Sequence, residues 1–369
     1  MYKSPSCYFG YQGPDRISVR QPLKVLVKVT IHILNYKFMK ISETVGIDVS
    51  KLVVDVRIHS NQCFSQFENS AKGFKKLHGW GLKNSEFPPD EILFVFEHTG
   101  LYSHNLAVYF SEHKVPFIMV PGLEIKRSLG ITRGKDDRVD ATKIARYAYR
   151  LRDEIDPYEL PSKQLLDIKN LLSLRDRMVR QRAGYKTSFK EQKRVYKGKG
   201  NPVLFKTQES LIKHLSKQID AIDKEMIDII CSNDQLQLIY KLITSIKSVG
   251  QQTALFMIAY TDGFTKFKDS RKFAAYCGIA PFPNSSGTSV RGKTRVSHLA
   301  NKKIKSLFDL CAKNAIIHNQ EMKKYYNKRV DQGKHKMCVI NIIRNKLLSR
   351  IFAVVNRKTP YVDLLQYET

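Results

Sequence analysis

The segment Thr44-Val-Gly-Ile-Asp-Val-Ser-Lys51 is followed at once by Leu52-Val-Val-Asp-Val-Arg-Ile58. Both runs are rich in β-branched residues and show partial alternation of apolar and polar side chains, which is typical of β-strands. We therefore predict a β-hairpin over these residues. Asp48 lies inside the first run, where a buried carboxylate is costly unless it is paired or binds a metal ion. Taken alone, an aspartate in a strand is more often structural than a ligand.

The segments that follow alternate between strand and helix patterns. Residues 91–96 form a continuous apolar run of the buried-strand kind, which ends at Glu97-His98-Thr99-Gly100. Residues 101–112 have a helical pattern, and residues 115–120 resemble another strand. This alternation predicts an α/β domain with a central, partly parallel sheet. Active sites of such sheets lie at strand ends, which is where Asp48 and Glu97 are expected.

Two further acids lie close together in the segment Lys135-Asp-Asp-Arg-Val-Asp-Ala-Thr-Lys-Ile-Ala-Arg-Tyr147. Asp137 and Asp140 are three residues apart in a stretch with helical apolar spacing, so a helix would place both carboxylates on one face. Like charges at that spacing repel unless a cation lies between them. We predict a divalent-metal site here; a pair of acids favoured by a helix N-terminus is the alternative.

The composition indicates a polyanionic partner. The 369 residues include 63 Lys and Arg against 34 Asp and Glu, which gives a net charge of +29. Such an excess favours nucleic acid, ahead of an anionic membrane surface, because each neutralised phosphate releases condensed counterions. The hydrophobic fraction of 42% allows sizeable cores, and the length suggests two or three domains.

Cysteine usage and hydropathy indicate the compartment. The six cysteines are scattered, without a Cys/His cluster at zinc spacing, as in proteins of a reducing compartment. No apolar run approaches the roughly 20 residues that cross a bilayer. We therefore expect a cytoplasmic protein without a membrane partner. Residues 1–39 are basic and carry no clear period, and we expect them to form an extension outside the folded domain.

The middle of the chain has a helical pattern with heptad-like apolar spacing in residues 165–179 and 215–229. Residues 175–200 carry ten Lys and Arg against Asp176 and Glu191. We predict a helical hairpin or coiled coil with a basic end, although a solvated charged helix face is the alternative. The candidate phosphate contacts are Arg180, Arg182, Lys193 and Arg194.

The C-terminal region contains two unusual stretches. In residues 242–259, two short apolar helices are predicted on either side of Val249-Gly250, as in a helix-hairpin-helix element that presents backbone N–H groups to phosphate. A core helical hairpin with a glycine turn is the alternative. Residues 277–297 are predicted to form a Gly/Pro/Ser-rich loop, in which Ser285, Ser286 and Ser289 precede a basic run. A hydroxyl beside such cations is well placed to meet a phosphodiester. The candidate binding residues are Arg291, Lys293, Arg295, Lys302 and Lys303.

These motifs, taken in order, resemble a known family. Gly-Ile-Asp48-Val-Ser-Lys, Glu97-His-Thr-Gly-Leu-Tyr, the Asp137/Asp140 segment and Gly-Ile-Ala-Pro-Phe-Pro-Asn-Ser-Ser286-Gly-Thr-Ser-Val-Arg-Gly resemble the signatures of the "one-hundred-and-ten" family of insertion-sequence transposases and its Piv/MooV DNA invertase relatives. The resemblance extends from about Met39 to Ala353. It implies an α/β plus α protein: a RuvC-like (RNase H fold) domain over 40–155, a helical coiled-coil connector over 156–238, a mainly helical transposase domain over 239–356, and a tail over 357–369.

The resemblance also implies roles for individual residues. Asp48, Glu97, Asp137 and Asp140 correspond to a D-E-D-D site for Mg²⁺, two ions in all, with Mn²⁺ as a possible substitute. Ser286 corresponds to the catalytic serine. Asp136 stands where the family usually has threonine, so it competes with Asp137 as a ligand, and Ser285 competes with Ser286. Asp55 matches no motif and is interpreted as structural. His98 is a candidate base, although a structural polar role beside Glu97 is favoured.

The implied function is a site-specific DNA recombinase that forms a covalent serine–DNA ester. Its expected partners are donor and target DNA, a structured guide RNA encoded by the element, and further copies of the chain in a dimer or tetramer. The resemblance places such a protein in the cytoplasm of a prokaryote, associated with the nucleoid. Two alternatives stay open: a RuvC-like nuclease that uses activated water, and a nucleic-acid-binding protein without catalysis.

Overall fold

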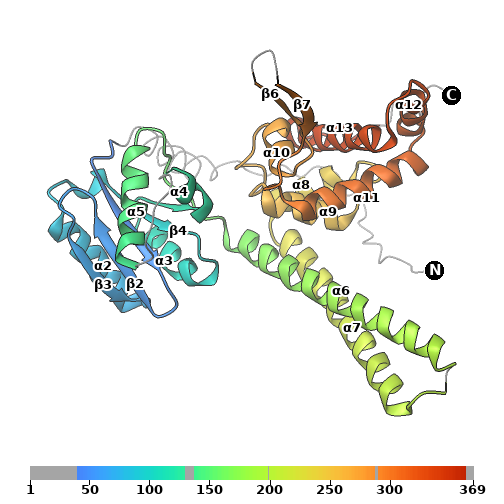
Figure 1. The fold of residues 1–369 in the computed structure, drawn as a ribbon, viewed down its shortest axis with the longest axis horizontal. Helices are drawn as coiled ribbons and strands as arrows, with labels where there is room; N and C mark the ends of the chain where they lie inside the picture. The colour runs from blue at the N-terminus through green and yellow to red at the C-terminus, as the bar shows by residue number, and fades with distance from the viewer. Residues whose placement is uncertain (1–39, 129–136, 198, 287–289, 363–369) are drawn as a thin grey trace, which may run out of the picture. The chain divides into compact units, whose positions relative to one another are not determined.

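The computed structural model describes residues 40–128, 137–197, 199–286 and 290–362, and the chain divides into two compact units, Met1–Leu160 and Pro161–Thr369 (Figure 1). Each unit is described by itself. The predicted extension over residues 1–39 and the end of the predicted tail, residues 363–369, lie outside the described residues.

A five-stranded mixed sheet forms the centre of the first unit. Its strands are β1 (Glu43–Val49), β2 (Val53–Ile58), β3 (Phe64–Glu68), β4 (Ile92–Glu97) and β5 (Phe117–Val120). The spatial order is β3-β2-β1-β4-β5; β1 pairs antiparallel with β2, whereas β1, β4 and β5 are parallel. The predicted hairpin and the predicted partly parallel sheet are both confirmed.

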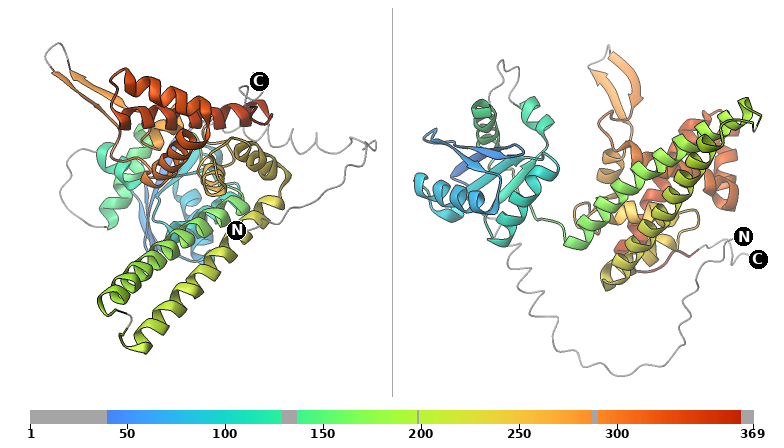
Figure 2. Two further views of the ribbon diagram at one scale, coloured as in Figure 1. Left: turned by 90° about the vertical axis from the view of Figure 1, so that its right-hand side faces the viewer. Right: turned by 90° about the horizontal axis from the view of Figure 1, so that it is seen from below.

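Helices cover both faces of this sheet, as Figures 1 and 2 show. They are α2 (Ala71–Asn84), α3 (Leu101–Glu112), α4 (Gly122–Ser128) and α5 (Asp137–Arg150), with a 3-10 turn at Pro89–Glu91. Phe74 of α2 and Phe110 of α3 share one core with Ile47 and Phe96 of the sheet. On the other face, α4 and α5 share a second core with alternate residues of β4 and β5, namely Leu93, Val95, Ile118 and Val120.

Helix α5 lies unusually close to strand β1. A methyl group at Gly46 would fall within 3.0 Å of the Ala141 carbonyl oxygen and the Ala145 nitrogen, and 2.8 Å from Cβ of Ala145. The hydroxyl of Thr44 donates a hydrogen bond to the Ala145 carbonyl at 2.9 Å. The strand and the helix can therefore approach this closely only because position 46 has no side chain.

The second unit is mainly helical. Its elements are α6 (Lys163–Val195), α7 (Pro202–Cys231), α8 (Asp234–Thr244), α9 (Gln251–Tyr260), α10 (Ser270–Tyr276), β6 (Phe282–Ser286), β7 (Val290–Arg295), α11 (Lys302–His318), α12 (Gln320–Asp331) and α13 (Lys336–Arg357). Helices α6 and α7 run side by side as a long hairpin in both figures. The first turns of α6, at Leu165, Ile168 and Leu172, join the core formed by the end of α7 and by α8 to α13.

The predicted loop over residues 277–297 is wrong in part, because β6 and β7 form an antiparallel two-stranded hairpin there. Ser285 is paired with Arg291 and Ser286 with Val290. The glycines and prolines of this segment suggested an irregular backbone, but pairing depends on which residues face each other across the turn, and composition does not encode that pairing.

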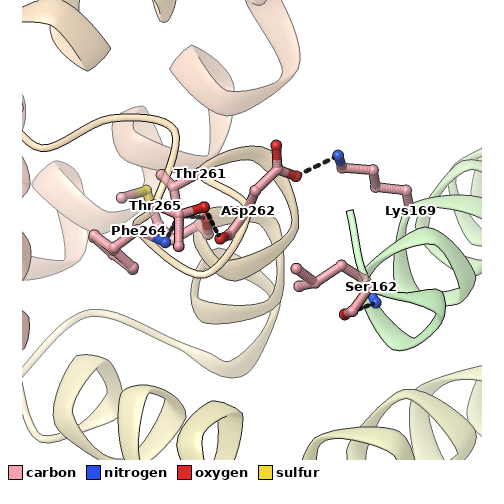
Figure 3. Close-up of polar contacts among 8 residues, drawn as sticks. Ser162, Lys169, Thr261, Asp262, Phe264 and Thr265 are labelled. Atoms are coloured by element: carbon pink, nitrogen blue, oxygen red, sulfur yellow. Dashed lines mark hydrogen bonds and ion pairs between the residues drawn. The ribbon is translucent and has the colours of Figure 1, made fainter. Parts of the chain in front are cut away.

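An ion pair holds the base of α6 against the turn that follows α9 (Figure 3). Lys169 Nζ lies 2.6 Å from Asp262 Oδ1. The turn itself is closed by Thr261 Oγ1, which accepts a hydrogen bond from the Phe264 amide at 2.9 Å, and by Thr265 Oγ1, which donates to the Asp262 carbonyl at 2.7 Å. Side chains therefore stabilise the left-handed backbone of Asp262 and Phe264.

In the described part of the chain, no helix is both long enough and apolar enough to span a bilayer.

The close packing at Gly46 gives a first prediction. Gly46→Ala is expected to destabilise the protein by about 3 kcal/mol, because the methyl group must displace the backbone of α5 or of β1. Thermal or urea unfolding followed by circular dichroism measures the effect. Gly79→Ala is the matched control: Gly79 is exposed on α2 with nothing within 4 Å of an added methyl, so this change should leave stability equal or slightly higher. Equal stability of the two variants would contradict the prediction.

Candidate metal centre

Asp48 and Glu97 lie at the carboxyl ends of neighbouring parallel strands. The register of β1 and β4 pairs Ile47 with Phe96, so Asp48 and Glu97 are the next residues on the two strands. Ile47 and Phe96 face the core under α2 and α3. Because side chains alternate along a strand, Asp48 and Glu97 both project to the opposite face, the one that α5 covers.

Helix α5 places the second pair of acids near this strand end. Ala145 meets β1 at Thr44 and Gly46, and Ala141 meets it at Gly46, so the helix runs antiparallel to the strand. One turn before Ala141 the helix begins at Asp137, beside the end of β1 that carries Asp48. The side chain of Asp137 and all of Asp136 lie outside the described residues, so the choice between these two acids stays a prediction.

Asp140 lies on the flank of the same helix. Its Oδ1 accepts a hydrogen bond from Lys143 Nζ at 2.8 Å, and its side chain is 36% exposed. This pair lies within the first two turns of α5, where a partly exposed ion pair contributes little to stability. A divalent cation that used Asp140 would have to replace the Lys143 ammonium as its partner.

The position of Glu97 depends on a glycine. A methyl group at Gly122, the first residue of α4, would overlap Oε1 and Cδ of Glu97 and would lie 2.9 Å from Oε2. The Glu97 carboxylate therefore packs directly against the backbone at the start of α4. The neighbouring amide of His98 donates to the Val120 carbonyl at 3.0 Å, which fixes the end of β4 against the end of β5.

Asp55 lies beside Asp48 in a row of polar side chains that crosses the sheet. It lies directly opposite Asp48 in the β1–β2 register and is only 3% exposed. Gln66 of β3 donates a hydrogen bond from Nε2 to Asp55 Oδ1 at 2.9 Å, which gives this acid a structural partner. Glu97, Asp48, Asp55 and Gln66 thus follow one another across four adjacent strands. The sequence contained a signal for this position, the cross-strand register of the predicted hairpin.

The donor set at this edge consists of oxygens. Carboxylates come from two strand ends, and Thr99 Oγ1, two residues after Glu97, is buried without a hydrogen-bond partner in the described part of the structure. Hard oxygen donors suit Mg²⁺ or Mn²⁺. Within the described residues alone, no group of three His, Cys, Asp or Glu side chains is arranged to hold a metal ion. The chemistry of the donors therefore fits a hard divalent cation, and Asp137 is the acid whose side chain is not described.

The predicted serine lies in the second unit. Ser286 is the last residue of β6 and Ser285 precedes it. The side chains of both serines, and those of Arg291 and Lys293, lie outside the described residues. Arg295 ends β7 with an exposed side chain, and Lys302 begins α11, also exposed.

Several of the predicted phosphate-binding cations already have protein partners. Asp176 of α6 pairs with both Lys303 and Arg180. Arg182 donates to Ser216 Oγ at 3.2 Å, Arg194 pairs with Glu191 at 2.7 Å, and the Lys193 ammonium lies 5.7 Å from the Phe189 ring centroid. Of these contacts, the Lys303–Asp176 pair joins α11 to α6 and the Arg182–Ser216 bond joins α6 to α7, whereas those of Arg180, Lys193 and Arg194 lie within α6.

The predicted helix-hairpin-helix element corresponds to α8, α9 and the turn between them. Ser248 has a φ of 78°, and Gly250 caps α9 without a side-chain hydrogen bond. Gln252 Nε2 donates to Asp223 Oδ1 at 2.7 Å, and Arg175 pairs with the same carboxylate at 2.6 Å. This network ties the turn to α6 and α7. A role of the turn in binding phosphate stays a prediction.

The contact between Glu97 and Gly122 gives a second prediction. Gly122→Ala is expected to push the Glu97 carboxylate away from the strand end and to weaken divalent-cation binding about tenfold or more. Titration of the purified protein with Mn²⁺, followed by electron paramagnetic resonance, measures this affinity. Gly184→Ala, on an exposed helix position with nothing within 4 Å, is the control and should bind Mn²⁺ as the parent protein does. Unchanged Mn²⁺ affinity in Gly122→Ala would show that Glu97 is not a ligand or that it relocates freely.

Comparison with known proteins identifies the family. A model of DEDD-type transposases, described as "Transposase", matches residues 45–192, and a model described as "Transposase IS116/IS110/IS902 family" matches residues 240–327.

Two relatives named "Pilin gene-inverting protein", from Moraxella lacunata and Moraxella bovis, are each 25% identical over 323 residues, which covers 86% of this chain and 97% of the relative. The "Insertion element IS110 uncharacterized 43.6 kDa protein" of Streptomyces coelicolor is 28% identical over 121 residues, or 32% of this chain and 29% of that protein. The first family model covers the sheet of the first unit, and the second covers the β6–β7 hairpin that carries Ser286. Both agree with the resemblance found in the motifs: the chain belongs to the IS110/IS116/IS902 family of transposases, enzymes that act on DNA.

Proposed function

We propose that this transposase is a site-specific recombinase that cleaves and rejoins DNA with a Mg²⁺–carboxylate site in a RuvC-like domain and with Ser286 as nucleophile. The observation that carries the proposal is the placement of Asp48 and Glu97 on adjacent strand ends, on the face where α5 brings in the segment with Asp137 and Asp140. Carboxylates that meet in this way at the end of a mixed sheet are the arrangement expected for two-metal phosphoryl transfer.

Each element contributes one fixed position to this site. The paired strands hold Asp48 and Glu97, Gly122 leaves room for the Glu97 carboxylate, and the contact at Gly46 sets the distance of α5 from β1. Asp48, Glu97, Asp137 and Asp140 would hold the metal. When bound there, Mg²⁺ would supply a Lewis acid that stabilises negative charge on the phosphate oxygens.

The serine would supply the covalent step. Its hydroxyl oxygen attacks phosphorus, a serine–phosphate ester forms, the bond from phosphorus to one deoxyribose oxygen breaks, and the departing oxygen takes up the proton. The reverse attack by the hydroxyl of a new strand restores a phosphodiester and the free serine. The number of phosphate ester bonds is conserved, so no external energy source is required. Arg291, Lys293 and Arg295 on the following strand support charge on the phosphate.

The relatives support recombination in preference to simple cleavage. Their name states that they invert a pilin gene, and inversion requires that broken strands be rejoined. We infer the same class of reaction for this chain, as transposition, inversion or both. A structured guide RNA and a homo-oligomer complete the proposal. The family resemblance supports both, and the net charge of +29 suits more than one nucleic-acid partner.

The carboxylate site gives a third prediction. Asp48→Asn and Glu97→Gln are each expected to reduce Mg²⁺-dependent DNA cleavage by about a thousandfold or more, because each removes a charged oxygen ligand. Binding to DNA with Ca²⁺ in place of Mg²⁺ should change little. Cleavage is measured on supercoiled plasmid carrying the ends of the element. The control is Glu112→Gln, an exposed acid at the end of α3. Full activity of Glu97→Gln, or cleavage in excess chelator, would defeat the metal mechanism.

The serine gives a fourth prediction. With a nicked suicide substrate that prevents religation, a protein–DNA adduct stable to detergent is expected for the parent protein and for Ser285→Ala, and none for Ser286→Ala. Denaturing gels with end-labelled DNA detect the adduct. A Ser286→Ala variant that still cleaves DNA would indicate a RuvC-like nuclease that uses water. An adduct lost only in Ser285→Ala would move the nucleophile by one residue.

A further inference from the structure

In the part of the first unit that the structure describes, exposed large hydrophobic side chains are confined to one edge of the sheet. Among its described residues, five such side chains are exposed: Leu52 (73%), Leu101 (81%), Tyr102 (47%), Leu123 (45%) and Val139 (39%). They come from the β1–β2 turn, the starts of α3 and α4, and the first turn of α5. Each of these places follows or adjoins the carboxyl end of a parallel strand, so all five surround the strand ends that carry Asp48 and Glu97. We call them the apolar rim.

Two parts of the apolar rim are fixed to each other by one residue. The backbone amide of Asn69 donates to the Leu52 carbonyl at 2.8 Å. Its side-chain Nδ2 donates to the Ser50 carbonyl at 2.8 Å and to the Tyr102 carbonyl at 3.2 Å. The turn that carries Leu52 and the start of α3 are therefore held together by hydrogen bonds across the strand ends. Gly100, with a φ of 69°, allows the sharp entry into α3 at that point.

Single exposed leucines are ordinary on protein surfaces, but their restriction to one edge needs a reason. Exposed cations lie near two of these side chains: Lys51 precedes Leu52, and Lys126 and Arg127 come three and four residues after Leu123 on α4, which also carries the exposed Glu124. Cations beside apolar groups fit a partner that carries phosphate and apolar surface together. DNA has both, yet in a closed duplex the apolar faces of its bases are stacked and inaccessible.

We propose that the apolar rim binds bases that have left the helical stack, next to the phosphate that a divalent cation at the carboxylates would hold. Leucine side chains inserted at a base step unstack it, and Tyr102 offers a ring on which a base can stack. The inference rests on the proposed carboxylate site, because it is this site that brings the DNA to the apolar rim. A protein surface seated on all five side chains would instead cover Asp48 and Glu97 and exclude their substrate.

The test compares two DNA probes of one sequence, an intact duplex and a duplex with a central unpaired bubble that contains 2-aminopurine. Both are bound by the full-length protein with Ca²⁺ in place of Mg²⁺, so that no cleavage occurs. The parent protein should prefer the bubble and change the 2-aminopurine fluorescence. The double variant L52A/L101A should lose about tenfold in affinity for the bubble and less than twofold for the intact duplex. Its fluorescence change should be reduced in parallel.

The control is L299A/L310A, in which two leucines of the second unit that are each 62% exposed are truncated. This variant should keep the preference of the parent protein for the bubble. If L52A/L101A keeps that preference too, the proposal is overturned. It is equally overturned if L52A/L101A changes the oligomeric state seen in sedimentation but not the affinity for the bubble, because the apolar rim would then contact protein. A failure of the proposed carboxylate site would give a different result: Glu97→Gln would cleave DNA normally, while the parent protein would still prefer the bubble.

Discussion

The contact between Gly46 and the backbone of α5 sets the geometry on which the candidate centre depends. Because a methyl group has no room at this point, the helix axis lies as close to β1 as main-chain atoms permit, and the Thr44 hydroxyl bonds to the same turn of the helix. Small residues at Ala141 and Ala145 make the complementary surface. Once these points of contact are fixed, the start of α5 must lie beside the end of β1. The spacing between Asp48 and the acids of α5 is thus set by Gly46, two residues before Asp48, because glycine has no side chain.

The sequence predicted the elements of the first unit better than their relationships. The β-branched runs identified β1 and β2, and the apolar run before Glu97 identified β4, because burial on a sheet imposes a visible pattern. Asp55 was interpreted as structural, which agrees with its bond to Gln66, but its place directly opposite Asp48 depends on the register of the predicted hairpin, and Gln66 lies on a third strand. The packing of Glu97 on Gly122 depends likewise on contacts between elements distant in the chain.

In the second unit, composition predicted the structure less well than the apolar patterns did in the first unit. Glycine, proline and serine suggested a loop where β6 and β7 pair, and the count of lysines and arginines gave no hint that Asp176 holds two of them. The count of 63 lysines and arginines therefore overstates how many cations are free to meet a phosphate. Pairing of this kind also has a structural benefit, since it lets a strongly basic hairpin pack against neighbouring helices that would otherwise repel it.

The hairpin of α6 and α7 has a mechanical property that follows from its proportions. Helix α6 contains 33 residues, so it is about 50 Å long at 1.5 Å per residue, yet its fully buried residues all lie in the first three turns. The hairpin is therefore a lever fixed at one end by Leu165, Ile168, Leu172 and the Lys169–Asp262 pair. A rotation of about 10° at that base would carry the far end through about 9 Å, which is larger than a base-pair step.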